Sequence, residues 1–448
     1  MRPLVHWKPG LSSSLRAACL LGFGLCLLSI PSRAATLTVD CTGAPPPGVY
    51  GSITDALNSL PLTATAETHV ITVTGTCMEN VGLFRVQHIT IQAPVGQTAT
   101  VIGDPNVPAN AVFDLVSARY ITLERLIIQG GGTQGPRSGI EVSINSYLLM
   151  QDCTVDGAAG SGIFVSDNSM LHVIRGTLRN NGSFGISVNS SSAADLNGFG
   201  STSGVQIHNN GGGVTASSSS LSLSGPVTIE NNSSFGVSLS QSQVILNAAQ
   251  EDIIIRGNPE GISLADHSSA TLRGQVRIEN NQGIGLVVFD GSSANLRGPR
   301  AAIIEGNQLN GILVSTQSVV RMNGPHKIRN NSLNDTVPAG IFVARNATLR
   351  AGNGVQIANN QGPGILAQQG ANLGLNNMTI SGNMEEGVRL LRQSVGDFLV
   401  GNVIVGNGIA SITCDVTSLV VGDVSGISNI NCSRIEREVG PPRAGRVH

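Results

Sequence analysis

The sequence predicts an all-β protein folded as a right-handed parallel β-helix, a solenoid with three short strands in each coil of about 24 residues. Two observations lead to this prediction. A glycine followed by an apolar residue recurs from residue 139 onward, and asparagine, usually doubled, precedes most of these glycines. Together they mark one structural unit that is repeated along the chain, which is typical of a solenoid.

The repeated glycine opens a short run of alternating apolar residues. Twelve such glycines follow one another at intervals of 21 to 29 residues: Gly139, Gly162, Gly185, Gly213, Gly236, Gly261, Gly285, Gly311, Gly340, Gly364, Gly387 and Gly408. The mean interval is about 24.5 residues. One unit holds three alternating runs, at residues 162–165, 170–174 and 176–178. Alternation with a period of two predicts strands rather than helices.

The doubled asparagines predict a turn that recurs in every coil. They stand at residues 180–181, 209–210, 231–232, 280–281, 330–331 and 359–360. Asparagine tolerates the left-handed backbone conformation that a sharp turn needs. When coils stack, these asparagines should lie above one another and share side-chain amide hydrogen bonds. Hairpin turns of a β-sandwich are the alternative, but a sandwich has no reason to keep this interval.

The repeat resembles that of the pectin-lyase-like superfamily of right-handed β-helix proteins, over about residues 40–430. Residues 50–57 resemble the amphipathic capping helix of these proteins, with Ser52 or Thr54 as its N-cap. Residues 71–81 resemble their first coil. A cap would cover the strand edges and core that an open end exposes. The resemblance implies the fold but no single activity, because unrelated activities share this scaffold.

The chain divides into four predicted segments. Residues 1–34 are predicted to be a secretory signal peptide, with basic residues, an apolar run at residues 19–30 and small residues before the cleavage site after Ala34. An N-terminal cap with a short helix (35–62), the β-helix (63–432) and a disordered tail (433–448) follow. The apolar run is too short for a membrane span. We therefore expect an exported protein without a transmembrane segment, secreted or extracytoplasmic, and periplasmic or surface-displayed if bacterial.

Export permits disulfides. Five cysteines follow the predicted signal peptide. Pairing Cys41 with Cys77 and Cys414 with Cys432 would place one disulfide at each end of the repeat and leave Cys153 as a buried free thiol. No two of these cysteines have the close spacing of a zinc site.

Enzymes of the pectin-lyase-like superfamily act on acidic polysaccharides, and their motifs are absent from this sequence. There is no Asp-Asp pair, and residues 396–402 resemble only loosely the esterase segment around its nucleophilic aspartate. Equal offsets from the repeated glycine give another candidate set. Asp266 and Asp290 share one offset, His267 follows Asp266, and Arg273 and Arg297 share another. In stacked coils the two carboxylates would be neighbours, as in an acid–base pair or a site for a hard cation. Turn formation is the alternative role of both aspartates, and we favour it.

A second column of charged residues precedes the asparagine turn. It contains Arg179, His208, Glu230, Arg256, Glu279, Glu305 and Arg329. Opposite charges mostly become neighbours when the coils stack, so we expect ion pairs between coils with a structural role.

Composition limits the function. The chain has 26 Lys+Arg and 28 Asp+Glu, with a formal net charge of −2, which argues against a nucleic-acid partner. Outward positions are rich in Ser, Thr, Gln and Asn. We predict a monomeric secreted or surface-displayed β-helix with a binding or structural role towards extracellular polysaccharide or another cell-surface component, without a cofactor. The alternative is a polysaccharide lyase, glycoside hydrolase or esterase acting on acidic polysaccharides, and calcium enters only under this alternative.

Overall fold

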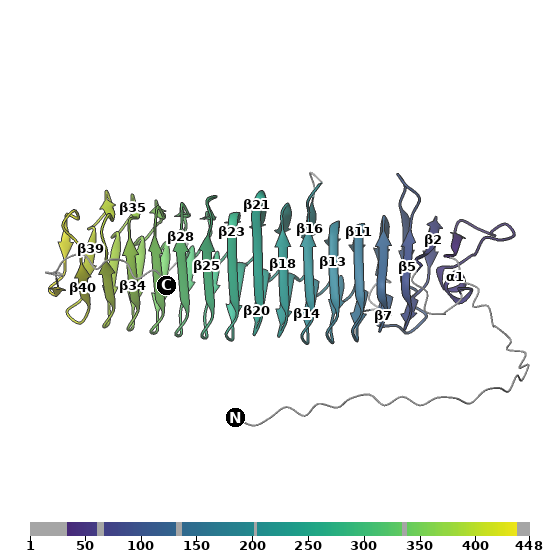
Figure 1. The fold of residues 1–448 in the computed structure, drawn as a ribbon. Helices are drawn as coiled ribbons and strands as arrows, with labels where there is room; N and C mark the ends of the chain where they lie inside the picture. Colours follow the sequence, from purple (N-terminus) through teal and green to yellow (C-terminus); the bar gives the residue numbers. More distant parts are fainter. Residues whose placement is uncertain (1–33, 61–66, 131–136, 201–203, 334–337, 437–448) are drawn as a thin grey trace, which may run out of the picture.

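The computed structural model describes residues 34–60, 67–130, 137–200, 204–333 and 338–436. They form one elongated stack of coils that runs from the N-terminal to the C-terminal end (Figure 1). All strand pairings between successive coils are parallel, for example β12 with β14. The predicted all-β parallel solenoid is therefore confirmed. The predicted signal peptide and most of the predicted tail lie outside the described residues.

One face of the stack is a sheet that we call the glycine sheet, because its strands follow the repeated glycine. Within the described residues it has 15 strands. They are β4 (Val81–Phe84), β7 (Ala111–Val116), β10 (Ser138–Ser143), β12 (Ile163–Val165), β14 (Phe184–Asn189), β17 (Gly212–Ser217), β20 (Phe235–Ser240), β22 (Glu260–Ala265), β24 (Leu286–Val288), β27 (Ile312–Val314), β30 (Ile341–Ala344), β33 (Ile365–Gln368), β36 (Val388–Leu391), β39 (Ile412–Cys414) and β41 (Ile430–Asn431).

The other two runs of each coil belong to a second sheet, the bent sheet, with 27 strands in the described part of the chain. Its first limb contains β1 (Thr36–Asp40), β2 (His69–Thr74), β5 (Gln87–Gln92), β8 (Arg119–Glu124), β11 (Tyr147–Asp156), β13 (Met170–Arg179), β15 (Ala193–Asn197), β18 (Ser220–Ser224), β21 (Gln243–Arg256), β23 (Ser269–Glu279), β25 (Ser293–Arg297), β28 (Val319–Asn323), β31 (Thr348–Gly352), β34 (Asn372–Asn376), β37 (Val395–Phe398), β40 (Leu419–Gly422) and β42 (Ile435–Glu436).

The second limb of the bent sheet lies on the far side of a bend in each coil. It contains β3 (Thr76–Met78), β6 (Ala99–Ile102), β9 (Leu126–Gln129), β16 (Val205–His208), β19 (Val227–Glu230), β26 (Ile303–Glu305), β29 (Lys327–Arg329), β32 (Gln356–Ala358), β35 (Thr379–Ser381) and β38 (Val403–Val405). The long strands β11, β13, β21 and β23 pass through both limbs. In β13 the bend falls at Arg175, whose φ is 53°. The three predicted runs thus make two sheets, not three.

The core lies between the two sheets and is built from alternate residues of each strand. In β12 the side chains of Ile163 and Val165 are fully buried, and in β14 those of Ile186 and Val188 occupy the same places one coil later. The buried residues form one continuous hydrophobic cluster. Most strands show this alternation, although β24 is buried throughout. In the alternating strands the residues between the buried ones face outward and are available for binding.

A ladder of asparagines runs along the stack, as the sequence predicts. Its members are the second residue of each doubled asparagine and their equivalents: Asn181, Asn210, Asn232, Asn258, Asn281, Asn307, Asn331, Asn360, Asn383 and Asn407. The backbone N–H of each of the first nine donates to the side-chain oxygen of the next at 3.0–3.2 Å. The left-handed residue is the first of each pair, such as Asn280 with a φ of 54°. Gly257 and Gly306 take that place in other coils, also with positive φ.

The repeated glycine is required by close approach between coils. A Cβ atom on Gly261 would overlap the carbonyl oxygen of Gly285 in the next coil and lie 3.1 Å from the side-chain nitrogen of Asn281. Gly408 is an exception to the predicted series. Ser411 holds the corresponding place, because Val388 donates its N–H to the Ser411 carbonyl at 2.9 Å. The requirement for a glycine pointed to the wrong residue in this coil, whereas the interval of 24 residues from Gly387 to Ser411 fits the repeat.

A second buried ladder, of serines, was missed by the sequence analysis. Its members follow the turn between the glycine sheet and the first limb: Ser146, Ser169, Ser192, Ser219, Ser242, Ser268, Ser292 and Ser318, and separately Ser394 and Ser418. Within each group the N–H of one serine donates to the hydroxyl oxygen of the next at 3.0–3.3 Å. The ladder ties this turn of neighbouring coils together, as the asparagines tie the other.

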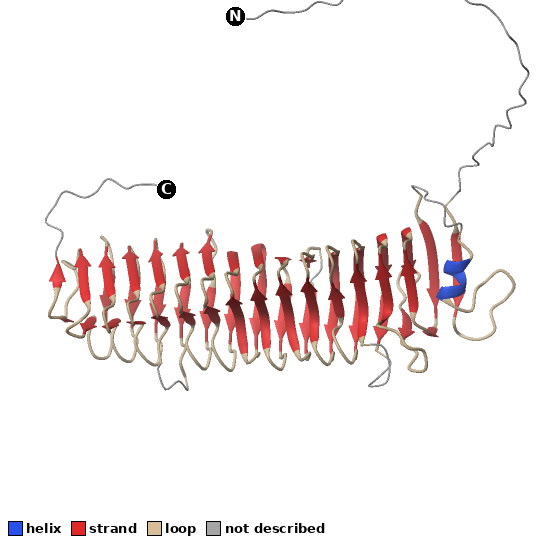
Figure 2. Ribbon diagram, turned by 90° about the horizontal axis from the view of Figure 1, so that it is seen from below, coloured by secondary structure: helices blue, strands red, loops and turns tan. Residues whose placement is uncertain are grey.

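A short helix, α1 (Ile53–Asn58), lies at the N-terminal end (Figure 2). Ser52 is its N-cap, and the Glu79 carboxylate accepts hydrogen bonds from the N–H groups of Ile53 and Thr54 at 2.8 and 3.0 Å. The helix has only six residues, and its capping role remains a prediction. Strand pairing already begins at β1, inside the segment predicted as a cap, and it reaches β42, beyond residue 432.

Disulfides join Cys41 to Cys77 and Cys414 to Cys432, and Cys153 is buried with a free thiol. These are the pairs that the sequence predicts. The predicted column of charged residues is also in register on the second limb, from Arg179 to Arg329. Arg256 pairs with Glu230 at 2.7 Å and Arg329 with Glu305 at 2.6 Å, so ion pairs do link neighbouring coils.

Candidate functional site

Asp266 and His267 lie in the exposed turn between β22 and β23, and Asp290 lies in the same turn one coil later. The His267 N–H donates to the Asp290 carbonyl oxygen at 2.9 Å, so the two turns are adjacent, as equal offsets predict. Both aspartates have positive φ, and the Asp266 carboxylate accepts a hydrogen bond from the Ser240 hydroxyl at 2.7 Å. These are features of turn residues.

The predicted arginines do not share this turn. Arg273 and Arg297 are register partners at the far ends of the first-limb segments of β23 and β25. Four residues of extended chain separate Ser269, next to the turn, from Arg273, which corresponds to roughly 13 Å. The structure therefore divides the predicted set into a turn group (Asp266, His267 and Asp290) and an arginine pair on the outer surface of the first limb.

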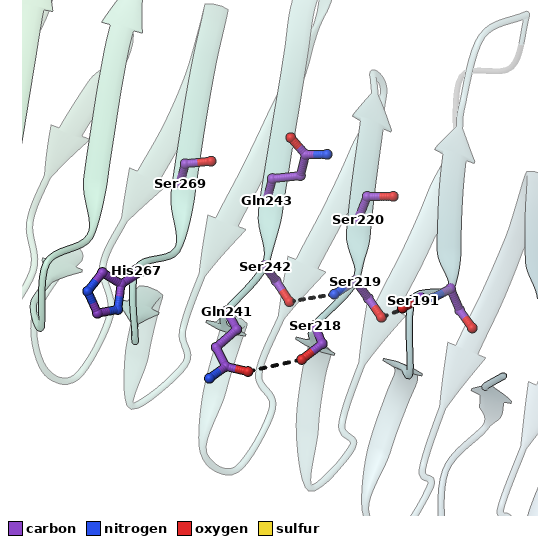
Figure 3. A pocket seen from close by; sticks show the side chains of 10 residues that line it. Ser191, Ser218, Ser219, Ser220, Gln241, Ser242, Gln243, His267 and Ser269 are labelled. Atoms are coloured by element: carbon purple, nitrogen blue, oxygen red, sulfur yellow. Dashed lines mark hydrogen bonds between the residues drawn. The ribbon is translucent and has the colours of Figure 1, made fainter. Parts of the chain in front are cut away.

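The surface beside His267 is a shallow depression of about 440 Å³. Figure 3 shows its lining, which comes from the turns before β15, β18, β21 and β23 and from the first residues of β18, β21 and β23. Apart from His267 it is made of serine and glutamine side chains. The Ser218 hydroxyl donates to the Gln241 side-chain oxygen at 3.1 Å. The Ser219 N–H donates to the Ser242 hydroxyl at 3.0 Å. Such a surface offers hydrogen bonds but no acid–base pair.

A second pair of arginines continues the outer surface of the first limb towards the C-terminal end. Arg321 of β28 and Arg350 of β31 are register partners. With Arg273 and Arg297 they form what we call the arginine row, on four successive strands of the limb. All four side chains are exposed, and no carboxylate forms an ion pair with them in the described part of the chain.

A groove of about 700 Å³ adjoins the C-terminal half of the arginine row. Arg321 and Arg350 line it together with residues in or next to β28, β31, β34 and β37, among them Asn323, Asn353, Asn372, Asn376 and the acidic Asp397. The Asn353 side-chain nitrogen donates to the Asn323 side-chain oxygen at 2.7 Å. The groove thus combines guanidinium groups with side-chain amides, a set of donors that suits oxygen-rich anions.

Two carboxylates meet on the opposite surface, outside the glycine sheet. Asp114 of β7 and Glu141 of β10 are register partners. Burial raises the pKa of Asp114, and burial together with the charges of Asp114 and Asp167 raises the pKa of Glu141. Asp114 Oδ1 is buried without a hydrogen-bond partner in the described residues. It faces a groove of about 610 Å³ that Asn80, Asn110 and Arg137 also line.

This carboxylate pair does not follow from the glycine repeat, because the coil of residues 111–116 lacks the repeated glycine. The signal that could have found it is the match between residues 112–115 and 139–142, each with an acidic residue between two inward apolar residues. Among the described residues, one group offers three metal-type ligands, namely Cys41, Cys77 and Glu79. Its cysteines are joined in a disulfide and offer no thiolate.

Comparison with known proteins supports the fold. The family model described as right handed beta helix region matches residues 111–225 and, in an overlapping match, 138–300. A search of curated proteins gives no match. No helix in the described residues is long and apolar enough to cross a membrane.

Three solved structures illustrate the likeness. A mutant of the periplasmic alginate epimerase AlgG is 11% identical with a TM-score of 0.38, over 86% of this chain and 82% of that one. The A-module of the mannuronan C-5 epimerase AlgE4 of Azotobacter vinelandii is 12% identical with a TM-score of 0.36, over 84% and 90%. PfbA, a surface adhesin of Streptococcus pneumoniae, is 12% identical with a TM-score of 0.35, over 78% and 83%. At these values no activity is inferred from them.

Proposed function

Because the chain is a right-handed parallel β-helix protein, we propose that it is an exported protein that binds an acidic polysaccharide along the outer surface of the first limb. The arginine row carries this proposal. Its arginines form two pairs of register partners, Arg273 with Arg297 and Arg321 with Arg350. The second pair is shifted by two residues along the strands, because Arg297 itself pairs with Asn323. Like charges on neighbouring strands repel one another and destabilise the sheet.

Elsewhere the chain neutralises comparable arginines. Arg175 pairs with Asp152 at 2.7 Å and Arg179 with Asp156 at 3.0 Å, in both cases between neighbouring coils. The four arginines of the row have no such partner, so their repulsion is left for a ligand to relieve. A carboxylate accepts two parallel hydrogen bonds from one guanidinium, which makes arginine well suited to uronic acids.

The form of the surface favours a polymer over a small ligand. Strands of neighbouring coils lie about 4.8 Å apart, so four strands place the row over roughly 14 Å. The groove beside it is open and lined by amides that can bind sugar hydroxyls. A linear chain of charged sugars can follow such a row, whereas a compact anion would contact one pair only.

Export is supported by the two disulfides, since disulfides persist mainly in oxidising compartments. The predicted signal peptide lies outside the described residues and remains a prediction. Its cleavage can be checked by N-terminal sequencing of the protein recovered from the extracytoplasmic fraction.

Isothermal titration with polygalacturonate and polymannuronate tests the binding function, beside dextran as an uncharged polymer and duplex DNA as an unrelated polyanion. We expect binding of a polyuronate that weakens with salt and falls at least tenfold in an Arg321→Ala, Arg350→Ala double variant. Arg256→Ala is the matched control, because Arg256 is an exposed arginine paired with Glu230 on the other limb. No binding by the parent, an unchanged double variant, or equal binding of DNA would each overturn the proposal.

The carboxylate pair of Asp114 and Glu141 favours a second candidate, an enzyme acting on acidic polysaccharides. Two neighbouring carboxyls whose pKa values are both raised can share a proton and serve as acid and base. A product screen on pectate and alginate tests it. Turnover that Asp114→Asn or Glu141→Gln abolishes, and that an Asp266→Asn, Asp290→Asn double variant retains, would support this candidate. A parent without turnover would exclude it for these polymers.

A further inference from the structure

Three aromatic side chains from successive coils lie together at the N-terminal end of the first limb. They are His88 of β5, Tyr120 of β8 and Tyr147 of β11. The rings of His88 and Tyr120 stack with centroids 4.7 Å apart and planes at 16°. The centroids of Tyr120 and Tyr147 are 5.9 Å apart, with planes at 48°. We call this group the aromatic column.

The column lies outside the core. Tyr120 is 57% exposed, and Met170, on the next strand β13, is 43% exposed. The inward positions of these strands are already filled by aliphatic residues such as Ile89 and Ile121. Core packing therefore does not account for the rings.

Backbone conformation does not account for them either. His88 and Tyr120 both have a φ of 56°, in the left-handed region. Glycine and asparagine adopt this conformation most readily and histidine more readily than most residues, whereas a tyrosine there is uncommon. Serine, arginine and glutamine also take left-handed positions elsewhere in the chain, and Tyr120 is the one tyrosine among the described residues that does. It has three tyrosines in all, and two of them are in the column. Residues retained against local preference are often found at functional sites.

The chemistry of the column fits a sugar ring. The stacked rings of His88 and Tyr120 cover part of each other, and the exposed remainder of Tyr120 offers an apolar surface. The phenol and imidazole groups at the ring edges can donate and accept hydrogen bonds. Thr90 and Thr122 face outward on the same strands and add hydroxyl groups. A pyranose has the same division, with an apolar C–H face and polar hydroxyls around its edge.

The column and the arginine row lie on the same outer surface. Five strand steps separate β11 from β23, which corresponds to roughly 24 Å. We infer that His88, Tyr120 and Tyr147 form a binding platform for an uncharged pyranose unit, distinct from the polyuronate site at the arginine row. That the ligand is a sugar rests on the proposed function. That there is a second site rests on the stacking and exposure of the aromatic column itself.

A crossed set of variants tests the platform. The probes are cellohexaose, maltohexaose and mannohexaose as neutral ligands and polygalacturonate as the charged one, measured by titration calorimetry and by tyrosine fluorescence. We expect a Tyr120→Ala, Tyr147→Ala double variant to lose at least tenfold in affinity for a neutral hexaose and to keep its affinity for polygalacturonate. The Arg321→Ala, Arg350→Ala variant should show the reverse. Tyr120→Phe, which keeps the ring, should retain most of the neutral-sugar affinity.

Several outcomes would overturn the platform without touching the polyuronate site. They are no binding of any neutral hexaose by the parent, unchanged affinity in the tyrosine double variant, and equal loss of neutral-sugar binding in both double variants. Self-association of the parent that the tyrosine double variant abolishes, without an effect on sugar binding, would assign the column to contact with a second copy instead. A parent that binds a neutral hexaose but not polygalacturonate would count against the proposed function and leave the platform standing. Thermal melting of each variant confirms that the fold is retained.

Discussion

The side-chain oxygen of Asn307 accepts two hydrogen bonds from Asn281, one from its backbone N–H at 3.1 Å and one from its side-chain amide at 2.9 Å. Asn281 in turn accepts the N–H of Asn258 at 3.1 Å. Each asparagine therefore closes one coil and fixes its spacing to the next. Since Asn281 is completely buried, its polar groups have no access to water as a substitute partner.

Asn281→Leu should lower the free energy of unfolding by about 1–3 kcal/mol or more, because it leaves the buried N–H of Asn258 without an acceptor. Asn280→Gly is the matched control. It keeps the left-handed turn that Gly257 and Gly306 form in other coils, so it should change stability little. Urea unfolding followed by circular dichroism measures both. Equal stability of Asn281→Leu and the parent would contradict the ladder.

Ser268→Ala should lower the free energy of unfolding by a smaller amount, about 0.5–1.5 kcal/mol, because it removes only the hydroxyl oxygen that accepts the Ser242 N–H. Ala347 and Ala371 already stand after the corresponding turn in later coils, which indicates that the gap is tolerated. Ser269→Ala, one residue further along and exposed, is the control and should be neutral. The same urea titration compares the free energies of unfolding of the two variants. If Ser268→Ala were as stable as the parent, the serine ladder would not contribute to stability.

Gly261→Ala should destabilise the stack by about 1–3 kcal/mol, because the new methyl group overlaps the carbonyl of the next coil. Gly374 is a strand glycine with space around it, its nearest neighbour being the flexible side chain of Arg350 at 3.6 Å. Gly374→Ala should therefore be tolerated. The difference in thermal midpoint between the two variants is the measurement, and similar midpoints would refute the close-approach argument.

Burial raises the pKa of Cys153 to about 12. The unfolded chain releases this proton near the ordinary value of 9.0, so the folded state binds more protons between pH 9 and pH 12. Stability should therefore fall as pH rises through this window, by up to about 1.4 kcal/mol per pH unit. Below pH 9 the group should have no effect.

Unfolding of the parent and of Cys153→Ala at pH 8 and pH 10 isolates this effect. The variant is expected to be less stable at both values, because of the cavity it creates, but its loss between the two should be smaller. The folded parent should also resist thiol reagents at pH 8. Rapid labelling of the native protein at Cys153 would show that the thiol is accessible, and the pH prediction would then fail.

Several features were within reach of the sequence because they repeat. The repeated glycine marks the same place in neighbouring coils, so residues at equal offsets from it lie side by side. Equal offsets in this way identified the neighbours Asp266 and Asp290 and the charged column from Arg179 to Arg329. The serine ladder was equally visible, since Ser169 and Ser192 each stand seven residues after a repeated glycine. It was missed because serine is common in these turns and does not stand out from them.

Other features do not show in the residue type. Ser411 takes the place of the repeated glycine in its coil, because it follows Asn407 by the same offset at which Gly387 follows Asn383, and a series restricted to glycine assigned Gly408 instead. The candidate set around Asp266 was divided for a different reason. Arg273 and Asp266 belong to the same coil, but a strand and a turn carry the chain away between them, so residues close in sequence are separated in space.

The sequence by itself determined the repeat, the inward and outward alternation of each strand and the positions of the four disulfide cysteines, because these are local or periodic properties of the chain. Only the tertiary structure decided which outward residues share a surface. His88, Tyr120 and Tyr147 are separated by unequal intervals. The register partners Arg273 and Arg297 are 24 residues apart, whereas the partners Arg321 and Arg350 are 29 residues apart. Hydrogen bonds between parallel strands set the register of each coil on the next, and turns of different length absorb the difference. Sequence offsets therefore lose the correspondence that strand pairing keeps.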